Sequence, residues 1–271
     1  LCRMPSSSRV VSKSVFFLVA FEFSRFVNSA PLSVWIHSMA YGNCSGTLLS
    51  ANEWTKSSAV YAFNFAISNQ EVLADLLLPL AALPYAWSFL QDRESGFELQ
   101  AVERVGARAY GLAKLLSVGA AAFLAVAAAM FLFLAGLYAM GMETLPGYPL
   151  NNNQYYAIAS AGHVGLFYLV RITIAGLTGS LAAVFALTVS SFLSNSYVAL
   201  LAPLLGFYTS QVLHSLLIPR LSAFRLDSVF FYQPIAGSAS FSFLWSAVYL
   251  LTLTALCARL FLWRLRKEAG E

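Results

Sequence analysis

A charged stretch from Asp92 to Lys114 gathers side chains that could do chemistry in water. Its charged residues are Asp92, Arg93, Glu94, Glu98, Glu103, Arg104, Arg108 and Lys114. Two carboxylates that face each other could act as an acid and a base, but in this stretch the carboxylates alternate with arginines. The stretch therefore does not indicate a catalytic carboxylate pair.

The spacing of these residues predicts a short amphipathic helix with an acidic start and a basic end. Ser95 and Glu98, three residues apart, are typical of a capping box. Asp92 and Glu94 lie where a helix N-terminus favours negative charge. The apolar residues at i+4 spacing form one stripe: Phe97, Ala101, Val105 and Ala109.

A basic stripe formed by Arg104 and Arg108, four residues apart, accompanies the apolar one. Two interpretations of the helix are open. It either lies on lipid headgroups, with its arginines held by anionic lipid, or docks a cytoplasmic partner protein.

The segments on either side of this helix are lipid-like. LLLPLAALPYAWSFL precedes it and LLSVGAAAFLAVAAAMFLFLAGL follows it. Of the 271 residues, 59% are hydrophobic and 10% are charged, and a soluble domain of this size cannot bury so much apolar surface. The sequence predicts a polytopic membrane protein, with a length that suits about six spans of about 20 residues.

We expect an all-α fold in a single transmembrane domain, with six transmembrane helices and a cytoplasmic amphipathic helix between spans 2 and 3. The expected segments are a cytoplasmic lead-in 1–13, span 1 at 14–36, an extracytoplasmic segment 37–70, span 2 at 71–91, the amphipathic helix 92–111, span 3 at 112–140, an outer loop 141–160, span 4 at 161–192, span 5 at 197–218, an outer loop 219–240, span 6 at 241–263 and a cytoplasmic tail 264–271. We expect no cleavable signal peptide.

Counting Lys and Arg residues predicts the orientation. With both termini inside, eleven of these residues fall on the cytoplasmic side and three outside, which is the usual bias of cytoplasmic loops. The net charge of +4 is spread along span ends, so nucleic acid is not an expected partner, and membrane lipid is.

Three charged residues lie deep inside predicted spans, away from both span ends. Glu22 and Arg25, three residues apart in span 1, either form their own ion pair, or belong to an interfacial helix, or make a functional polar contact. Arg171 in span 4 either snorkels outward, which is the favoured interpretation, or pairs with an acidic residue inside the bundle. Small residues in the same span predict a helix-packing face: Ala175, Gly176, Gly179 and Ser180.

Common nucleotide, metal and catalytic motifs do not occur in the sequence. Gly106 and Gly111 resemble the start of a P-loop, but Leu112-Ala113-Lys114 follows where Gly-Lys-Ser/Thr is required. The three histidines are isolated, and the three cysteines have no metal spacing. We therefore expect no catalytic residue, no metal and no cofactor on this chain.

The charged stretch resembles the first cytoplasmic loop of ABC-2 type transporter permeases. The resemblance consists of Asp92-Arg93-Glu94-Ser95-Gly96 followed by Arg104, Tyr110 and Lys114. It includes Leu78-Pro79 and Pro84-Tyr85 in the preceding span, and the hydropathy order of nearly the whole chain.

The resemblance implies a permease subunit that forms half of the translocation pathway of an exporter, for an antimicrobial peptide (as in lantibiotic immunity) or another amphiphile. Its partners would be a second permease chain, identical or related, and a cytoplasmic ATPase dimer that holds the ATP and Mg. The chain itself would not be an enzyme, and it would lie in the cell membrane of a bacterium. The charged helix would be the coupling helix, with contacts from Asp92, Arg93, Glu94, Ser95, Gly96, Phe97, Glu98, Ala101, Arg104, Val105, Arg108 and Lys114.

Two other functions stay open. One is an integral membrane enzyme that acts on a lipid or isoprenoid, and the other is a non-catalytic scaffold or channel. The functional polar contact of Glu22 and Arg25 would lie along the transport path or between two permease chains.

Overall fold

The computed structural model describes residues 59–60, 63, 73–142, 144, 155–193, 195–217, 226, 229 and 238–269. They belong to one compact unit, Thr55–Glu271. The predictions for 1–13, 14–36 and 37–70 fall outside these residues except for three positions in the last range, and Glu22 and Arg25 lie outside them.

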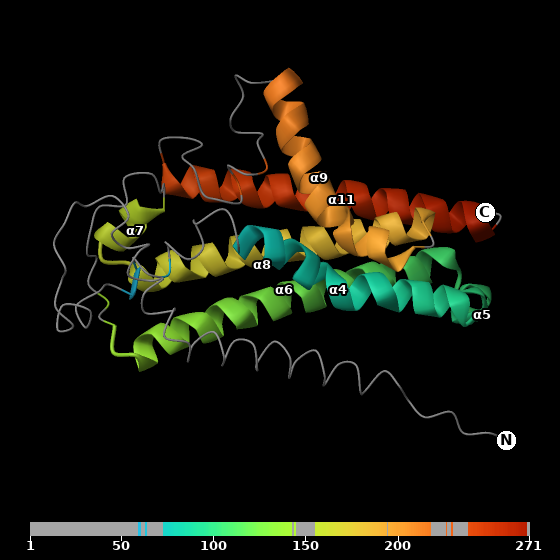
Figure 1. The fold of residues 1–271 in the computed structure, drawn as a ribbon, viewed down its shortest axis with the longest axis horizontal. Coiled ribbons are helices and arrows are strands. Elements are labelled where there is room, and N and C mark those ends of the chain that lie inside the picture. The colour runs from blue at the N-terminus through green and yellow to red at the C-terminus, as the bar shows by residue number, and fades with distance from the viewer. Residues whose placement is uncertain are drawn as a thin grey trace. The chain divides into compact units, whose positions relative to one another are not determined.

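The described elements are helices, and this part of the chain contains no strand (Figure 1). They are α4 (Leu73–Glu94), α5 (Phe97–Val105), α6 (Ala107–Ala139), α7 (Tyr156–Ser160), α8 (Val164–Phe192), α9 (Ser196–Leu217) and α11 (Ala239–Ala269). By length and composition, α6, α8 and α11 can each cross a membrane. The all-helical prediction is therefore confirmed for the described residues, and three helices suit a membrane protein.

The helix bounds differ from the expected segments in three places. Asp92–Glu94 is the last turn of α4, so the expected helix 92–111 is divided among α4, α5 and α6. α6 begins at Ala107 rather than at residue 112, because a single glycine separates it from α5. α11 continues to Ala269, so most of the expected tail is helical.

Helix α8 is the centre of the described bundle. It contacts α4, α6, α7, α9 and α11. Within its most apolar 18-residue window, 61% is buried, against 33% for α6 and 17% for α11. The peripheral helices therefore keep apolar faces that a membrane can cover.

Small residues explain how closely α6 and α8 approach. A Cβ built at Gly179 would lie 2.6 Å from Val126 Cγ2, and one at Gly176 would lie 2.7 Å from the Phe123 ring. A side chain at either position would force its neighbour on α6 to shift. The predicted packing face of α8, which also includes Ala175 and Ser180, lies along this contact with α6.

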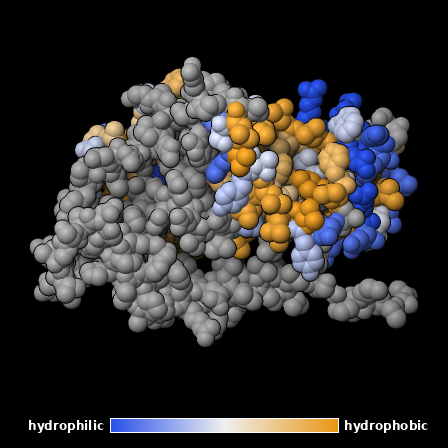
Figure 2. All heavy atoms as spheres, turned by 45° about the horizontal axis from the view of Figure 1, so that its top comes forward, coloured by the Kyte–Doolittle hydropathy of each residue, from blue (hydrophilic) through white to orange (hydrophobic). Residues whose placement is uncertain are grey.

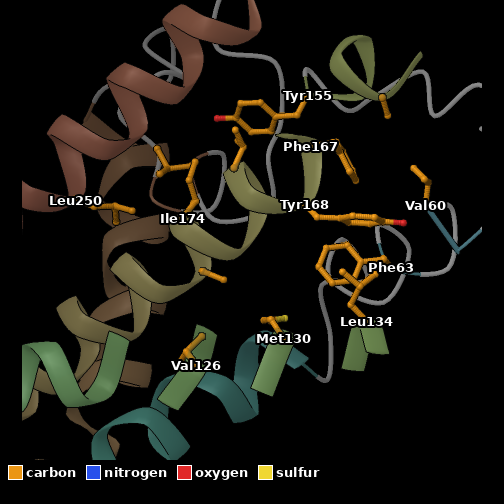
Figure 3. Close-up of a cluster of buried hydrophobic side chains, with 14 of the residues drawn as sticks. Val60, Phe63, Val126, Met130, Leu134, Tyr155, Phe167, Tyr168, Ile174 and Leu250 are labelled. Atoms are coloured by element: carbon orange, nitrogen blue, oxygen red, sulfur yellow. The ribbon is translucent and has the colours of Figure 1, made fainter. Parts of the chain in front are cut away.

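The largest apolar cluster joins α6, α8 and α11 (Figure 3). Tyr168 lies edge-on to Phe63 with ring centroids 5.1 Å apart, and its hydroxyl accepts a hydrogen bond from Tyr138 at 3.3 Å. Arg171 is fully buried beside this cluster, with its guanidinium 6.0 Å from the Phe167 ring. The favoured prediction that Arg171 snorkels outward is therefore wrong, because protein encloses its side chain.

A second apolar cluster lies where α5 joins the bundle. It combines Phe89 of α4, Tyr110 of α6, Leu187 of α8, and Phe261 and Leu265 of α11. The Phe89 and Phe261 rings pack edge to face, 5.3 Å apart. Four helices thus converge in a cluster against which Ala101 and Val102 of α5 pack.

Hydrophobic residues cover much of the described surface, and hydrophilic residues gather at the α5 end (Figure 2). On α6 the outward leucines and phenylalanines are largely exposed, for example Leu116 at 72% and Phe131 at 63%. Such a surface is unfavourable in water and suits lipid.

Candidate functional site

The candidate site is the segment from Asp92 to Lys114, which we call the α5 region. Two glycines frame the nine-residue helix α5. Gly96 adopts φ 71° and ψ 5°, a left-handed conformation that ends α4. Gly106 adopts φ 83° and ψ 149°, a region that is nearly restricted to glycine, and it separates α5 from α6.

The predicted capping box is not formed. The N-cap of α5 is Gly96, and no side chain caps the helix. Ser95 Oγ instead donates to the backbone oxygen of Asp92 at 3.1 Å. Glu98 turns into the protein and is only 7% exposed. Because Gly96 ends α4 and begins α5 directly, Asp92 and Glu94 lie at the C-terminus of α4 rather than at a helix N-terminus.

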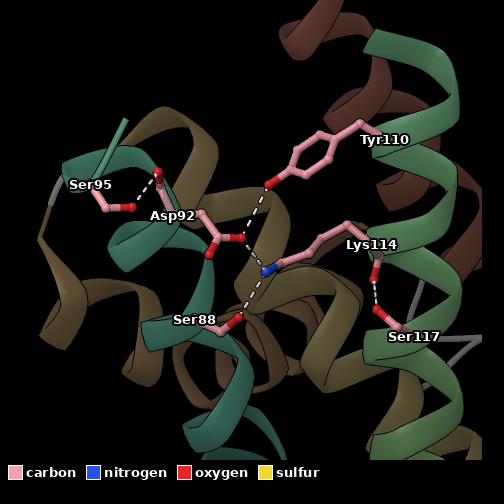
Figure 4. Close-up of polar contacts among 6 residues, drawn as sticks. All are labelled: Ser88, Asp92, Ser95, Tyr110, Lys114 and Ser117. Atoms are coloured by element: carbon pink, nitrogen blue, oxygen red, sulfur yellow. Dashed lines mark hydrogen bonds and ion pairs between the residues drawn. The ribbon is translucent and has the colours of Figure 1, made fainter. Parts of the chain in front are cut away.

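A polar cluster around Asp92 joins the end of α4 to the start of α6 (Figure 4). Asp92 Oδ2 accepts hydrogen bonds from Lys114 Nζ at 2.6 Å and from Tyr110 Oη at 3.1 Å. Lys114 also donates to Ser88 Oγ at 2.8 Å. The two charged side chains are only 15% and 25% exposed, so their pairing is stronger than that of a surface pair.

A second ion-pair group joins α4 to α11. Glu268 accepts from Arg93 at 3.2 Å and from Arg264, one turn earlier on α11, at 2.8 Å. The Arg264 guanidinium lies 5.5 Å from the ring of Phe192 at the end of α8. The ends of α4, α8 and α11 are therefore connected beside α5.

Glu98 is the buried carboxyl of the site. Burial raises the pKa of Glu98 above its ordinary value, and the nearby Glu268 and Asp92 raise it further. Arg93 and Lys114 act in the opposite direction. The balance favours the protonated form more than in an exposed glutamate.

Helix α5 is buried along one part of its surface and exposed along the rest. Glu98, Ala101 and Val102 pack against the bundle. The remaining surface exposes both apolar and charged side chains: Phe97 at 55%, Leu99 at 69% and Val105 at 60%, with Gln100, Glu103 and Arg104 also exposed. This exposed surface is amphipathic and has no partner among the described residues.

The predicted stripes of the sequence do not survive as single faces. The break at Gly106 places Ala109 and Arg108 in α6, away from the regular spacing of Val105 and Arg104. All four of these residues are exposed. The i+4 spacing assumed one continuous helix, which the glycine interrupts.

Other contributors to the site were missing from the sequence prediction. Ser88, Arg264 and Glu268 contact its charged residues, yet they belong to a predicted span and a predicted tail. Only the i,i+4 spacing of Arg264 and Glu268 could have indicated an ion pair from sequence.

Two acids of this region, Asp92 and Glu268, are paired with cations. In the described ranges, no three His, Cys, Asp or Glu side chains gather to hold a metal. The α5 region thus combines ion pairs between helices with an exposed amphipathic surface.

No family model, curated protein or solved structure matches the chain. The resemblance to ABC-2 permeases consequently rests on the residues of the sequence.

Proposed function

We propose that the chain is the permease subunit of an ATP-binding cassette exporter, and that α5 docks a separate cytoplasmic ATPase. The observation that carries this proposal is the amphipathic exposed surface of α5. Phe97, Leu99 and Val105 are exposed to solvent beside charged residues. A simple turn between two spans does not need such a face, whereas a protein contact does.

The connections of α5 support transmission of movement. Asp92 and Lys114 bind the two helices that flank α5, and Arg93 binds α11 through Glu268. A displacement of α5 would therefore reach α4, α6 and α11 together. Such a coupled element is what a motor protein needs in order to move a membrane bundle.

The remaining parts of the proposal come from the sequence. Six spans, a cytoplasmic α5 and a second permease chain follow from hydropathy, the Lys and Arg bias and the ABC-2 resemblance. The partner ATPase would hold ATP and Mg, and the cargo would be an antimicrobial peptide or another amphiphile. The membrane would be the cell membrane of a bacterium.

Co-purification from the native membrane tests this function. The detergent-solubilised chain should recover an ATPase with Walker motifs, and Arg104→Glu should reduce that recovery roughly tenfold or more, since reversing a charge at an interface costs several kcal/mol. The matched control is Ser160→Glu in α7, an exposed position in a different element, which should retain the ATPase.

Two results would contradict the proposal. One is that Arg104→Glu and wild-type chain recover the same amount of ATPase. The other is turnover of a lipid substrate by the purified chain without nucleotide, which would favour the membrane enzyme instead.

A further inference from the structure

The outward face of α11 changes its chemistry over the last turns of the helix. Earlier in the helix this face is apolar, with Phe241, Val248 and Leu256 each more than half exposed. Toward the C-terminus it continues as Arg259, Trp263, Arg266 and Lys267. The spacing of i, i+4, i+7 and i+8 places these four residues on one side of the helix.

The burial pattern confirms that this side points away from the bundle. Arg259, Trp263 and Lys267 are exposed, with Trp263 at 55%, whereas Phe261 and Leu265 are buried against the other helices. We call Arg259, Trp263, Arg266 and Lys267 the α11 stripe.

The cations of the α11 stripe are not neutralised by the described protein. Glu268, their neighbour in sequence, lies on the other side of α11 and is held by Arg93 and Arg264. Within the described ranges, no carboxylate forms an ion pair with Arg259, Arg266 or Lys267, and Arg266 Nε is buried without a hydrogen-bond partner. Lys267 Nζ lies 5.6 Å from the Trp263 ring, which orients the ammonium beside the indole.

We propose that the α11 stripe binds the phosphate headgroup of an anionic phospholipid. The apolar face that precedes it is continuous with the stripe, so acyl chains can lie on Leu256 and Leu260 while the cations hold the phosphate. Guanidinium groups suit this task because they donate two hydrogen bonds to one phosphate. Trp263 lies between the apolar part of this face and its last cations, Arg266 and Lys267. Tryptophan is enriched at such positions, where membrane and water meet.

A second copy of this chain is a less suitable occupant. In a two-fold dimer the same patch faces itself, so Arg259, Arg266 and Lys267 would approach their own copies. Like charges facing each other across an interface cost several kcal/mol. A lipid phosphate instead complements the positive charge, and it requires only that α11 crosses the membrane, not that α5 docks an ATPase.

Native mass spectrometry of the delipidated chain tests the proposal, with phosphatidylglycerol and phosphatidylcholine added separately. The wild-type chain should retain phosphatidylglycerol in preference to phosphatidylcholine. Replacing Arg259→Gln and Lys267→Gln together should weaken phosphatidylglycerol binding roughly tenfold or more, because each cation near a membrane surface contributes about 1 kcal/mol. Circular dichroism should show unchanged helix content, since both residues are exposed.

The control pair is Arg259→Lys with Lys267→Arg, which exchanges the two cations within the stripe and keeps its charge. It should leave phosphatidylglycerol binding within about twofold of wild type, a difference below about 0.5 kcal/mol. Soluble glycerol phosphate should fail to displace the lipid, because it lacks acyl chains. The proposal would be overturned if the control pair lost as much phosphatidylglycerol binding as the stripe variant, or if wild type retained the two lipids equally. Displacement of the lipid by glycerol phosphate would also overturn it, as would a dimer that the stripe variant dissociates.

Discussion

Lys114 is the cation on which the polar cluster of the α5 region depends. It binds both Asp92 and Ser88, and the Asp92 side chain is only 25% exposed. Lys114→Met would leave this carboxylate with only the Tyr110 hydroxyl among its described side-chain partners. We expect a loss of about 1–3 kcal/mol in unfolding free energy, since a half-buried charge without its partner is costly. Thermal unfolding in detergent measures it.

Arg108→Met is the matched control for that prediction, because Arg108 is an exposed cation of the same helix with no described ion pair. It should change the unfolding midpoint little. The double variant Asp92→Asn with Lys114→Met should be less destabilised than the sum of its single variants. Additive losses would mean that the two side chains do not interact.

Glu98 should make stability depend on pH. Its pKa is raised, so the folded chain binds this proton more tightly than the unfolded chain. Stability therefore falls as pH rises from the ordinary glutamate pKa through the raised folded value. Glu98→Gln cannot ionise, so it should raise the unfolding midpoint by a few degrees at neutral pH and have no such effect below about pH 4.

Glu103→Gln serves as the control for the pH dependence, because Glu103 is exposed on the same helix. Its melting profile should follow wild type at every pH. A Glu98→Gln variant that is destabilised at neutral pH would show that the ionised carboxylate is held by its cations instead.

The sequence could indicate which residues of the site matter, but not how they contact one another. The resemblance included Asp92, Tyr110 and Lys114, and the structure brings these three together. Periodicity within one helix could not find this contact, because it joins residues on two helices. Glu98 was assigned to a cap for the same reason: the capping pattern was present, while its burial in the bundle depends on the whole fold.

At the scale of elements, Gly106 defines where α5 ends and α6 begins. Its backbone at φ 83° and ψ 149° is strained for any residue with a Cβ, even though space for a Cβ is free. Gly106→Ala should therefore cost about 1–3 kcal/mol in unfolding free energy. Gly136→Ala is the control, since Gly136 is inside α6 with nothing near its Cβ position, and it should be neutral or slightly stabilising.

The contact between α6 and α8 gives a second prediction at this scale. Gly179→Ala should destabilise the bundle by about 1–3 kcal/mol, because its Cβ would overlap Val126, a stiff β-branched residue. Adding Val126→Ala should make the double variant more stable than the sum of the two single losses predicts. Unfolding in detergent measures all three variants, and strictly additive losses would contradict the overlap.

Helix composition predicted the long elements better than their ends. The apolar runs predicted helices that the structure contains as α6, α8 and α11. The small residues Gly176 and Gly179 marked a packing face, because a missing side chain is visible in the sequence. The division at Gly96 and Gly106 was missed, since a glycine is compatible with a helix interior until the fold selects a positive φ.

At the scale of the whole molecule, the described helices have one charged end and one end near α7. Arg93 and Glu268 connect the C-terminal ends of α4 and α11, and α5 joins the same end. α7 precedes the opposite end of α8. Helix α8 has 29 residues and is therefore about 43 Å long, which exceeds the roughly 30 Å thickness of the hydrocarbon core of a membrane. By its length, α8 can therefore place its two ends on opposite sides of a membrane.

Cysteine labelling of intact cells with a membrane-impermeant maleimide tests this topology, in a chain whose three cysteines are first replaced. Ser160→Cys in α7 should react, because it lies at the end of α8 away from α5. Glu103→Cys in α5 and Ala269→Cys in α11 should react only after the membrane is opened, because the Lys and Arg bias predicts a cytoplasmic location for that end. Each position is exposed, so protection reports the membrane rather than burial. If Glu103→Cys and Ala269→Cys react from opposite sides of the membrane, the Arg93–Glu268 connection between α4 and α11 is contradicted. If both react in intact cells, α5 lies out of reach of a cytoplasmic ATPase.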